Sequence, residues 1–325
     1  MTIATTGPRP ADAPWYSRRP WLVVLLAGGA LLLISSVVTG ITEDTVLMPA
    51  VILVGSFLVP VATVAFALTR KHDGHLSAET ILLAFLLGGT LGLVSAALLE
   101  TYLLPRADGT FLMVGLIEEV TKGAVLLGVA HWCVKSRKPL DGLVLGAVVG
   151  AGFAAFESSG YALNVLLSHV ASHPVLNILE TEASRAILSP FGHITWTALL
   201  GGALFYTARE DGRFRLTKGL FWTFAGVVAL HAAWDASYGW SIVVTQGLVG
   251  DGWSWTLPNA SHWVGSPTGD DLAVFNIVYN GLLIINATIG AMWVAHKHRF
   301  FQRLRPAEPA PAPAVVVTAA PPLAS

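Results

Sequence analysis

The chain contains 325 residues, of which 54% are hydrophobic and only 12% are charged. Soluble domains carry about 25% charged residues, so this composition, with a mean hydropathy of +0.65, excludes an ordinary soluble protein and indicates an integral membrane protein. The net charge of −1 gives no reason to expect nucleic-acid binding, and the single cysteine, Cys133, excludes an internal disulfide.

Eight stretches are apolar enough to cross a hydrocarbon core of about 30 Å, which requires about 20 residues of helix. In chain order they are 21–40, 46–68, 79–99, 111–134, 140–168, 187–207, 219–238 and 272–295. The first stretch follows two arginines as a signal peptide would, but no convincing cleavage site follows it, so we predict a retained span. The expected fold is all-α, a polytopic membrane helix bundle of about eight transmembrane helices at 21–298.

The segments outside this bundle differ in composition. Residues 1–20 and 306–325 are rich in Pro and Ala, which predicts disordered ends. The segment 239–271 contains no Lys or Arg but has four tryptophans, Trp240, Trp253, Trp255 and Trp263. Because Trp is favoured at the membrane interface, we expect this segment to be a loop that rests there, with a role in receiving substrate as the alternative.

The distribution of basic residues predicts the orientation. With the N-terminus in the cytoplasm, 16 of the 19 Lys and Arg residues fall in inside segments. Only Arg106 and Arg185 fall outside, and Lys122 lies within a span. Basic residues are retained on the cytoplasmic side, so both termini are expected inside.

Ionisable residues within spans are costly and are functional candidates by default. The fourth span carries Glu118, Glu119 and Lys122, the fifth Glu157 with Tyr161, the sixth His193, and the seventh His231 with Asp235. Helix spacing allows either glutamate to pair with Lys122 and puts His231 and Asp235 on one face. At 1.5 Å per residue, the carboxylates and imidazoles of all four spans fall in the outer half of the membrane, which predicts that they meet.

Structural roles are the alternative for each group taken singly. A Glu–Lys pair can be a neutralised pair that holds helices together, His231 with Asp235 a satisfied hydrogen bond, and His193 a buried structural histidine. Tyr161 is expected to be a hydrogen-bonding partner. Glycines of the fifth span, Gly146, Gly150, Gly152 and Gly160, are expected to permit close helix packing.

The combination favours activation of water against a carbonyl group. A buried carboxylate can accept a proton from water, and histidines can stabilise the oxyanion or protonate the leaving amine. The same groups could instead hold Zn²⁺ through His193, His231 and Glu119, or through Glu118 or Asp235 in its place. No HExxH sequence is present. A mechanism without metal uses both adjacent carboxylates and explains Lys122, so we favour it while keeping Zn²⁺ open.

At these residues the chain resembles the PrsW family of intramembrane proteases, within the superfamily of CAAX-type endopeptidases and bacteriocin-processing membrane proteins. The resemblance covers about 110–240 and rests on EExxK from Glu118, FExxxY from Phe156, His193, and HxxxD from His231. It implies cleavage of a membrane-anchored protein, similar to an anti-sigma factor, near the extracytoplasmic side of a bacterial cell membrane. It also implies catalytic roles for Glu118, Glu119, His193, His231 and Asp235, supported by Lys122, Glu157 and Tyr161.

Two other functions fit the same residues. A proton- or ion-coupled transporter would use Glu118, Glu157 and Asp235 as a relay, but it predicts a polar path to the cytoplasmic face or inverted repeats, and neither is evident. A non-catalytic membrane scaffold would have no need to retain all these candidate catalytic residues. The sequence therefore favours the endopeptidase.

Overall fold

The computed structural model describes residues 15–42, 44–69, 76–105, 110–135, 137–167, 174–209, 211–249, 263 and 266–304. Over these residues the regular elements are all helices, which confirms the all-α fold class. The elements are α1 (Trp15–Arg18), α2 (Pro20–Thr42), η1 (Thr45–Leu47), α3 (Met48–Thr69), α4 (Ala78–Leu87), η2 (Gly88–Gly92), α5 (Leu93–Leu103), α6 (Phe111–Cys133), α7 (Pro139–Leu167), α8 (Pro174–Leu188), η3 (Ser189–Phe191), α9 (His193–Tyr206), α10 (Lys218–Val249) and α11 (Gly269–Arg303). The C-terminal segment 306–325 and most of 1–20 lie outside the described residues.

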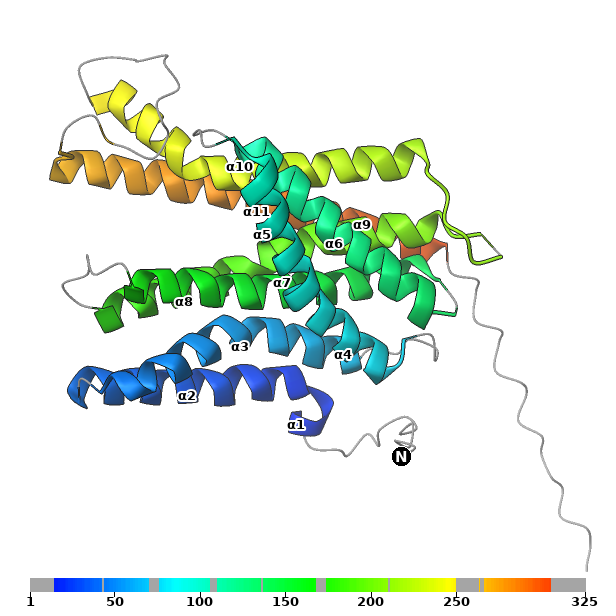
Figure 1. Ribbon diagram of the computed structural model, residues 1–325, viewed down its shortest axis with the longest axis horizontal. Coiled ribbons are helices and arrows are strands. Elements are labelled where there is room, and N and C mark those ends of the chain that lie inside the picture. Colours follow the sequence, from blue (N-terminus) through cyan, green and yellow to red (C-terminus); the bar gives the residue numbers. More distant parts are fainter. Residues whose placement is uncertain are drawn as a thin grey trace, which may run out of the picture.

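Five helical stretches are long and apolar enough to cross a membrane: Pro20–Thr42, Met48–Thr69, Ala78–Leu103, Pro139–Leu167 and Gly269–Arg303. The third comprises α4, a π-helical turn and α5, and in Figure 1 it crosses the other helices obliquely. The remaining predicted spans correspond to α6, α9 and α10. The α6 helix carries three charged residues near its middle, and α9 has only 14 residues, so neither is a simple apolar span.

The predicted sixth span, 187–207, is not one helix. The α8 helix ends at Leu188, a 3₁₀ turn covers Ser189–Phe191, and α9 begins at His193. Pro190 cannot continue the hydrogen-bond ladder of α8, and Gly192 between the two helices has a non-helical backbone, with φ −94° and ψ −121°. The break makes His193 the first residue of a helix and not an interior one.

The predicted loop 239–271 also starts too early. The α10 helix continues past the expected end of the seventh span to Val249, so 239–249 is helical and Trp240 belongs to α10. Trp263 packs against Phe275 of α11, with ring centroids 5.7 Å apart. Trp253 and Trp255 lie outside the described residues.

The central helix of the bundle is α7, which packs against α3, α4, α8 and α9. Its contact with α9 is made through glycines at four-residue spacing. A Cβ atom at Gly142, Gly146 or Gly150 would collide with the backbone oxygen of Gly201, Thr197 or His193, respectively. The backbones of α7 and α9 are therefore in direct contact, which sets the height of His193 against α7.

The other two glycines expected to permit close helix packing, Gly152 and Gly160, differ in their surroundings. A Cβ atom at Gly152 would collide with the backbone oxygen of Phe85 on α4, so this glycine also permits close packing. The prediction is wrong for Gly160, where a Cβ atom would meet nothing within 4 Å.

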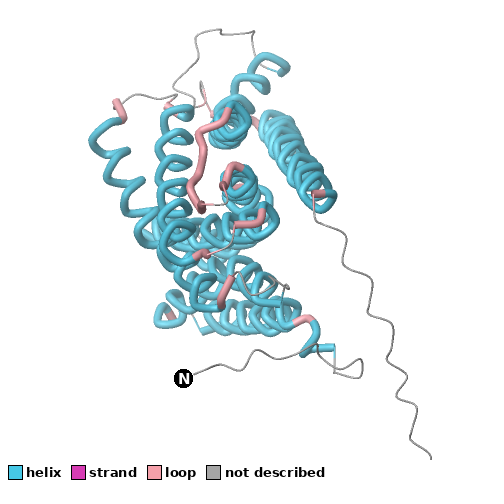
Figure 2. Tube along the Cα trace, turned by 90° about the vertical axis from the view of Figure 1, so that its right-hand side faces the viewer, coloured by secondary structure: helices cyan, strands magenta, loops and turns pink. Residues whose placement is uncertain are grey.

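The helices at the edge of the bundle expose apolar side chains. On α2, Leu31, Leu33 and Ile34 are each more than half exposed, and on α11 the same holds for Ile277 and Ile284. Figure 2 shows α11, the helix that leads to the C-terminal trace, at the periphery. Lipid is the medium that accommodates such apolar faces.

Candidate active site

The α6 helix contributes three charged side chains to the interior of the bundle. Glu119 and Lys122 are fully buried and Glu118 is 6% exposed. Lys122 Nζ lies 2.6 Å from Glu119 Oε1 and 3.3 Å from Glu118 Oε2, as the i,i+3 and i,i+4 spacing predicts. The Lys122 ammonium also lies 2.8 Å from His193 Nδ1 and 4.4 Å from the ring centroid of Phe153. The expected Glu–Lys pairing is confirmed, and it extends to a histidine of another helix.

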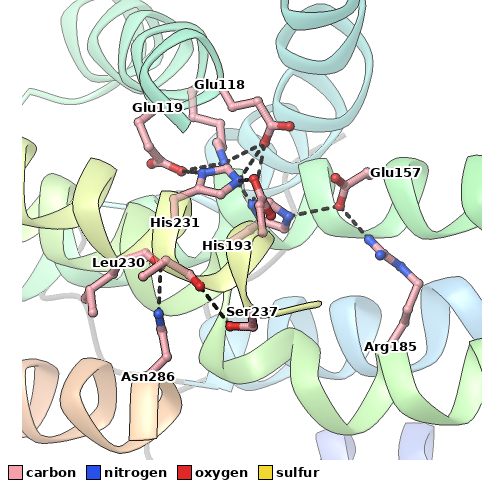
Figure 3. Close-up of polar contacts among 12 residues, drawn as sticks. Glu118, Glu119, Glu157, Arg185, His193, Leu230, His231, Ser237 and Asn286 are labelled. Atoms are coloured by element: carbon pink, nitrogen blue, oxygen red, sulfur yellow. Dashed lines mark hydrogen bonds and ion pairs between the residues drawn. The ribbon is translucent and has the colours of Figure 1, made fainter. Parts of the chain in front are cut away.

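The two histidines each use one ring nitrogen on a carboxylate, as Figure 3 shows. His193 Nε2 lies 2.9 Å from Glu157 Oε2, and His231 Nδ1 lies 2.9 Å from Glu119 Oε1. Both glutamates are paired with a cation, Arg185 or Lys122, and an ionised carboxylate only accepts hydrogen bonds. The two ring nitrogens therefore carry the protons and donate.

These hydrogen bonds leave one acceptor nitrogen on the ring of each histidine. With Nε2 of His193 and Nδ1 of His231 protonated, His193 Nδ1 and His231 Nε2 are acceptors. They lie 3.9 Å and 3.5 Å from Glu118 Oε2, respectively. The sequence prediction that α6, α9 and α10 bring their ionisable groups together is confirmed.

Asp235 is at the edge of this cluster. Its Oδ2 lies 3.4 Å from His231 Nε2, and its side chain is 28% exposed, against 2% for His231. The predicted one-face arrangement of His231 and Asp235 is therefore correct, and of the two Asp235 is the more accessible.

Tyr161 makes a contact of a different kind from the predicted hydrogen bond. The Arg185 guanidinium carbon lies 4.2 Å from the Tyr161 ring centroid, an arrangement that stabilises a cation over an aromatic face. The phenol is 51% exposed. Tyr161 thus supports the site through its ring, by holding Arg185.

Sequence reasoning missed two residues of the site. The distribution of basic residues accounts for Arg185 only as an outside cation, yet its Nη2 lies 2.5 Å from Glu157 Oε2. Trp196 stacks on His231, with ring centroids 4.6 Å apart and planes at 26°, and packs edge-on to His193. The position of Trp196, one helical turn after His193 on the same face, could have indicated it.

A cavity of about 250 Å³ adjoins the cluster. Its walls come from α7, α8, α9, α10 and α11 and include Glu157, Arg185, His193, Asp235 and Tyr279. A larger cavity of about 500 Å³ lies between α3, α7, α9 and α11, but no residue of the cluster lines it. The smaller cavity is the candidate substrate site because His193, Glu157 and Asp235 of the cluster line it.

The donor set fits a divalent metal ion. One ligand atom each of Glu118, His193 and His231 lies within 4.8 Å of the others. Ligands about 2.0–2.2 Å from a zinc ion are separated from one another by about 3.4 Å in a tetrahedral site, close to the spacings around Glu118 Oε2. In each histidine the other ring nitrogen donates to a carboxylate, which is the usual arrangement of metal-binding imidazoles. Against a metal, the Lys122 ammonium already donates to His193 Nδ1.

Comparison with known proteins gives one match. The family model for the PrsW family intramembrane metalloproteases matches residues 77–255, more than half of the chain. No curated protein and no solved structure gives a match. The matched region extends from α4 to α10 and includes every residue of the cluster.

Proposed function

This chain belongs to the PrsW family of intramembrane metalloproteases, and we propose that it is an endopeptidase that cleaves a membrane-anchored protein near the extracytoplasmic side of the membrane. Membership of the family makes it a membrane-bound peptidase. The substrate side, the substrate class and the roles of the residues are the proposal. Its setting is a bacterial cell membrane, and its partners are the lipid bilayer and a protein similar to an anti-sigma factor.

One observation carries the proposal. Two imidazoles, each hydrogen-bonded to a carboxylate through one ring nitrogen, place their other nitrogens 3.9 Å and 3.5 Å from the same carboxylate oxygen, Glu118 Oε2. A hydrogen bond that only joins two helices does not require two histidine nitrogens to lie beside one carboxylate oxygen. A site that binds and activates a water molecule, or a cation, does need it.

The residues of the cluster divide into those that act and those that orient. Glu118 is 6% exposed, whereas Glu119 is fully buried, and Glu118 lies beside the acceptor nitrogens of both histidines. It is therefore the group that accepts a proton from the attacking water. Glu119 is fully buried and orients His231, while Glu157 orients His193. Asp235, beside His231 Nε2 at the cavity wall, is the second candidate for proton transfer.

A divalent ion, with Zn²⁺ suited to these donors, would be held by Glu118, His193 and His231, and Asp235 instead of Glu118 would then accept the proton. Such an ion would supply a more acidic bound water and polarisation of the scissile carbonyl. The charges are compatible with an ion, because Glu118 and Glu119 share one cation, Lys122, and Asp235 contacts only His231 among the ion pairs of the described residues. The metal-free mechanism favoured from the sequence stays a prediction. The hydrogen bonds from His193 to Glu157 and from His231 to Glu119 now favour the metal.

The proposed topology has eight membrane crossings with both termini in the cytoplasm. In it α8, η3 and α9 together make the sixth crossing, and α6 and α10 are the fourth and seventh. Sixteen Lys and Arg residues then lie inside and Arg106 lies outside, with Lys122 and Arg185 within crossings, which supports this orientation. The cluster then lies in the outer half of the membrane, where a substrate segment just outside its membrane anchor can reach it.

Ion transport is less well supported. A relay would need polar groups that continue along α6 and α9 away from the cluster. Along α9 the buried polar side chains include Thr197 and, directly after the helix, Thr207, which are uncharged. The apolar side chains there form a core that includes Val125, Leu126, Val129, Leu200 and Leu204. Such a core interrupts proton transfer.

Comparative proteomics tests the proposed function. Membranes that contain the active protein are compared with membranes that contain Glu118→Gln at equal expression. Ectodomains released only by the active protein are the expected result, because the substitution removes the proton acceptor but keeps the shape of the side chain. Identical sets of released proteins would contradict the proposal.

A further inference from the structure

The α8 helix is unusually polar for its surroundings. It packs beside α2, α3 and α7, and Figure 1 shows it running alongside α7. Its sequence, PVLNILETEASRAIL, includes two glutamates and an arginine. Two of these charged side chains, one helical turn apart, point to different neighbours and hold the helix in place.

The first attachment is made by Glu182 to α3. Glu182 is only 1% exposed, and its Oε1 accepts a hydrogen bond from Ser56 Oγ at 2.7 Å. Gly55 makes the space for it, because a Cβ atom there would lie 2.8 Å from the Glu182 carboxylate. This contact fastens α8 to α3.

The second attachment is made by Arg185 to three residues of α7. Arg185 Nε donates to Ser158 Oγ at 2.7 Å, Nη2 donates to Glu157 Oε2 at 2.5 Å, and the guanidinium lies over the Tyr161 ring. A planar guanidinium suits such a set of directed contacts, which an ammonium cannot reproduce in full.

The same carboxylate oxygen connects Arg185 to the active site. Glu157 Oε2 also lies 2.9 Å from His193 Nε2, as Figure 3 shows. Arg185 therefore holds the acceptor of the His193 Nε2 proton, on the opposite side of the ring from the Lys122 ammonium that donates to Nδ1. If Arg185 were absent, Glu157, whose side chain is only 15% exposed, would lose the cation that it contacts, which is unfavourable.

We propose that Arg185 is a positioning residue of the catalytic site, and that docking of α8 completes the site by bringing this guanidinium onto Glu157. The inference rests on the proposed proteolytic function and adds α8 to its machinery. Arg185 acts through Glu157 on His193, whose Nδ1 then stays directed at Glu118. Undocking of α8 would leave the peptidase folded but inactive.

A spectroscopic measurement tests the positioning role without any substrate. In the full chain labelled with ¹⁵N-histidine in detergent micelles, the His193 ring nitrogens should show a single tautomer with the proton on Nε2. Arg185→Gln should shift the His193 Nε2 and Hε2 resonances, because the hydrogen bond to Glu157 is loosened, and Arg185→Lys, which keeps a cation, should partly restore them. The control is Glu180→Gln, an exposed glutamate of the same helix. An unchanged His193 spectrum in Arg185→Gln would overturn the proposal.

Kinetics provide the second measurement. The substrate is the membrane protein whose release depends on Glu118 in the proteomic comparison. Arg185→Gln should lower kcat by about 10- to 100-fold, the usual effect of removing a partner that orients a ligating histidine, with KM nearly unchanged. A raised KM with unchanged kcat would overturn the proposal, since Arg185 would then bind substrate. If the wild-type protein releases nothing, the proposed function fails, while the His193 spectrum still decides the role of Arg185.

Discussion

At the residue scale, the site depends on how each ionisable side chain is paired. All three glutamates of the cluster contact a cation, but Glu119 and Glu157 also accept from imidazoles, whereas Glu118 lies beside the other ring nitrogens of His193 and His231. Adjacent glutamates in the sequence thus have different surroundings, because successive positions on a helix point about 100° apart. The choice between Glu118 and Glu119, open from the sequence, favours Glu118 as the reacting group.

Metal analysis tests the role of this residue set. We expect the purified protein to contain about one zinc ion per chain, and strong chelation to remove the ion together with proteolytic activity. Zinc addition should restore both, and His231→Ala should bind less than wild type because it loses one of three protein ligands. Full activity in thoroughly chelated protein would establish the metal-free mechanism instead.

Lys122 should matter mainly for stability. Lys122→Met leaves Glu119 fully buried without its cation, and breaking a buried ion pair costs about 3–5 kcal/mol. The expected result is a lower midpoint of thermal unfolding in detergent, measured by circular dichroism. A suitable control is Lys218→Met at the start of α10, an exposed lysine. Equal midpoints for the two variants would show that Lys122 is not a structural counter-ion.

At the element scale, two features place His193. The break at Ser189–Gly192 makes it the first residue of α9, and the glycines of α7 bring the α9 backbone into contact. Gly150, which touches the His193 backbone, is two turns before Glu157, which reaches the His193 ring. The same face of α7 therefore positions both the main chain and the side chain of this histidine.

The close packing of α7 against α9 can be tested with two alanine substitutions on α7. Gly146→Ala should force α7 and α9 apart, because the new Cβ atom would collide with the Thr197 backbone oxygen, and such overpacking costs about 1–3 kcal/mol. Gly160→Ala on the same helix adds a methyl group to open space and should be neutral or slightly stabilising. Thermal unfolding and proteolytic activity are the measurements. Similar losses in both variants would contradict close α7–α9 packing.

At the scale of the whole molecule, the buried cluster is surrounded by a bundle whose outer helices expose apolar side chains. The charged groups of α6 are covered by α7, α9 and α10, while α2 and α11 present leucines and isoleucines outward. A dry, shielded interior strengthens electrostatic interactions among the clustered groups. The arrangement explains how a membrane protein can retain several charges that would be costly in contact with lipid.

Reporter fusions test the proposed orientation of the molecule. Fusions after Lys71, Arg137 and Arg213 should report the cytoplasm, because the basic residues accumulate in these segments. Fusions between α10 and α11, within 250–268, should report the outside. An outside result at Arg137 together with a cytoplasmic result at 250–268 would invert the topology and move the cluster to the inner half of the membrane.

The sequence by itself determined the membrane class, the helical fold and most members of the cluster. Composition and helix spacing are local properties, and they are sufficient to assign helix faces to Glu118, Glu119, Lys122, His231 and Asp235. The break before His193 has a local signal in Pro190 and Gly192. Only the tertiary structure decided the length of α10 and the contacts of Arg185. These depend on neighbours that are distant in sequence: Arg185 meets Glu157 only because α8 docks on α3 and α7. Pairings between helices also select the imidazole tautomers, and no spacing within one helix can specify them.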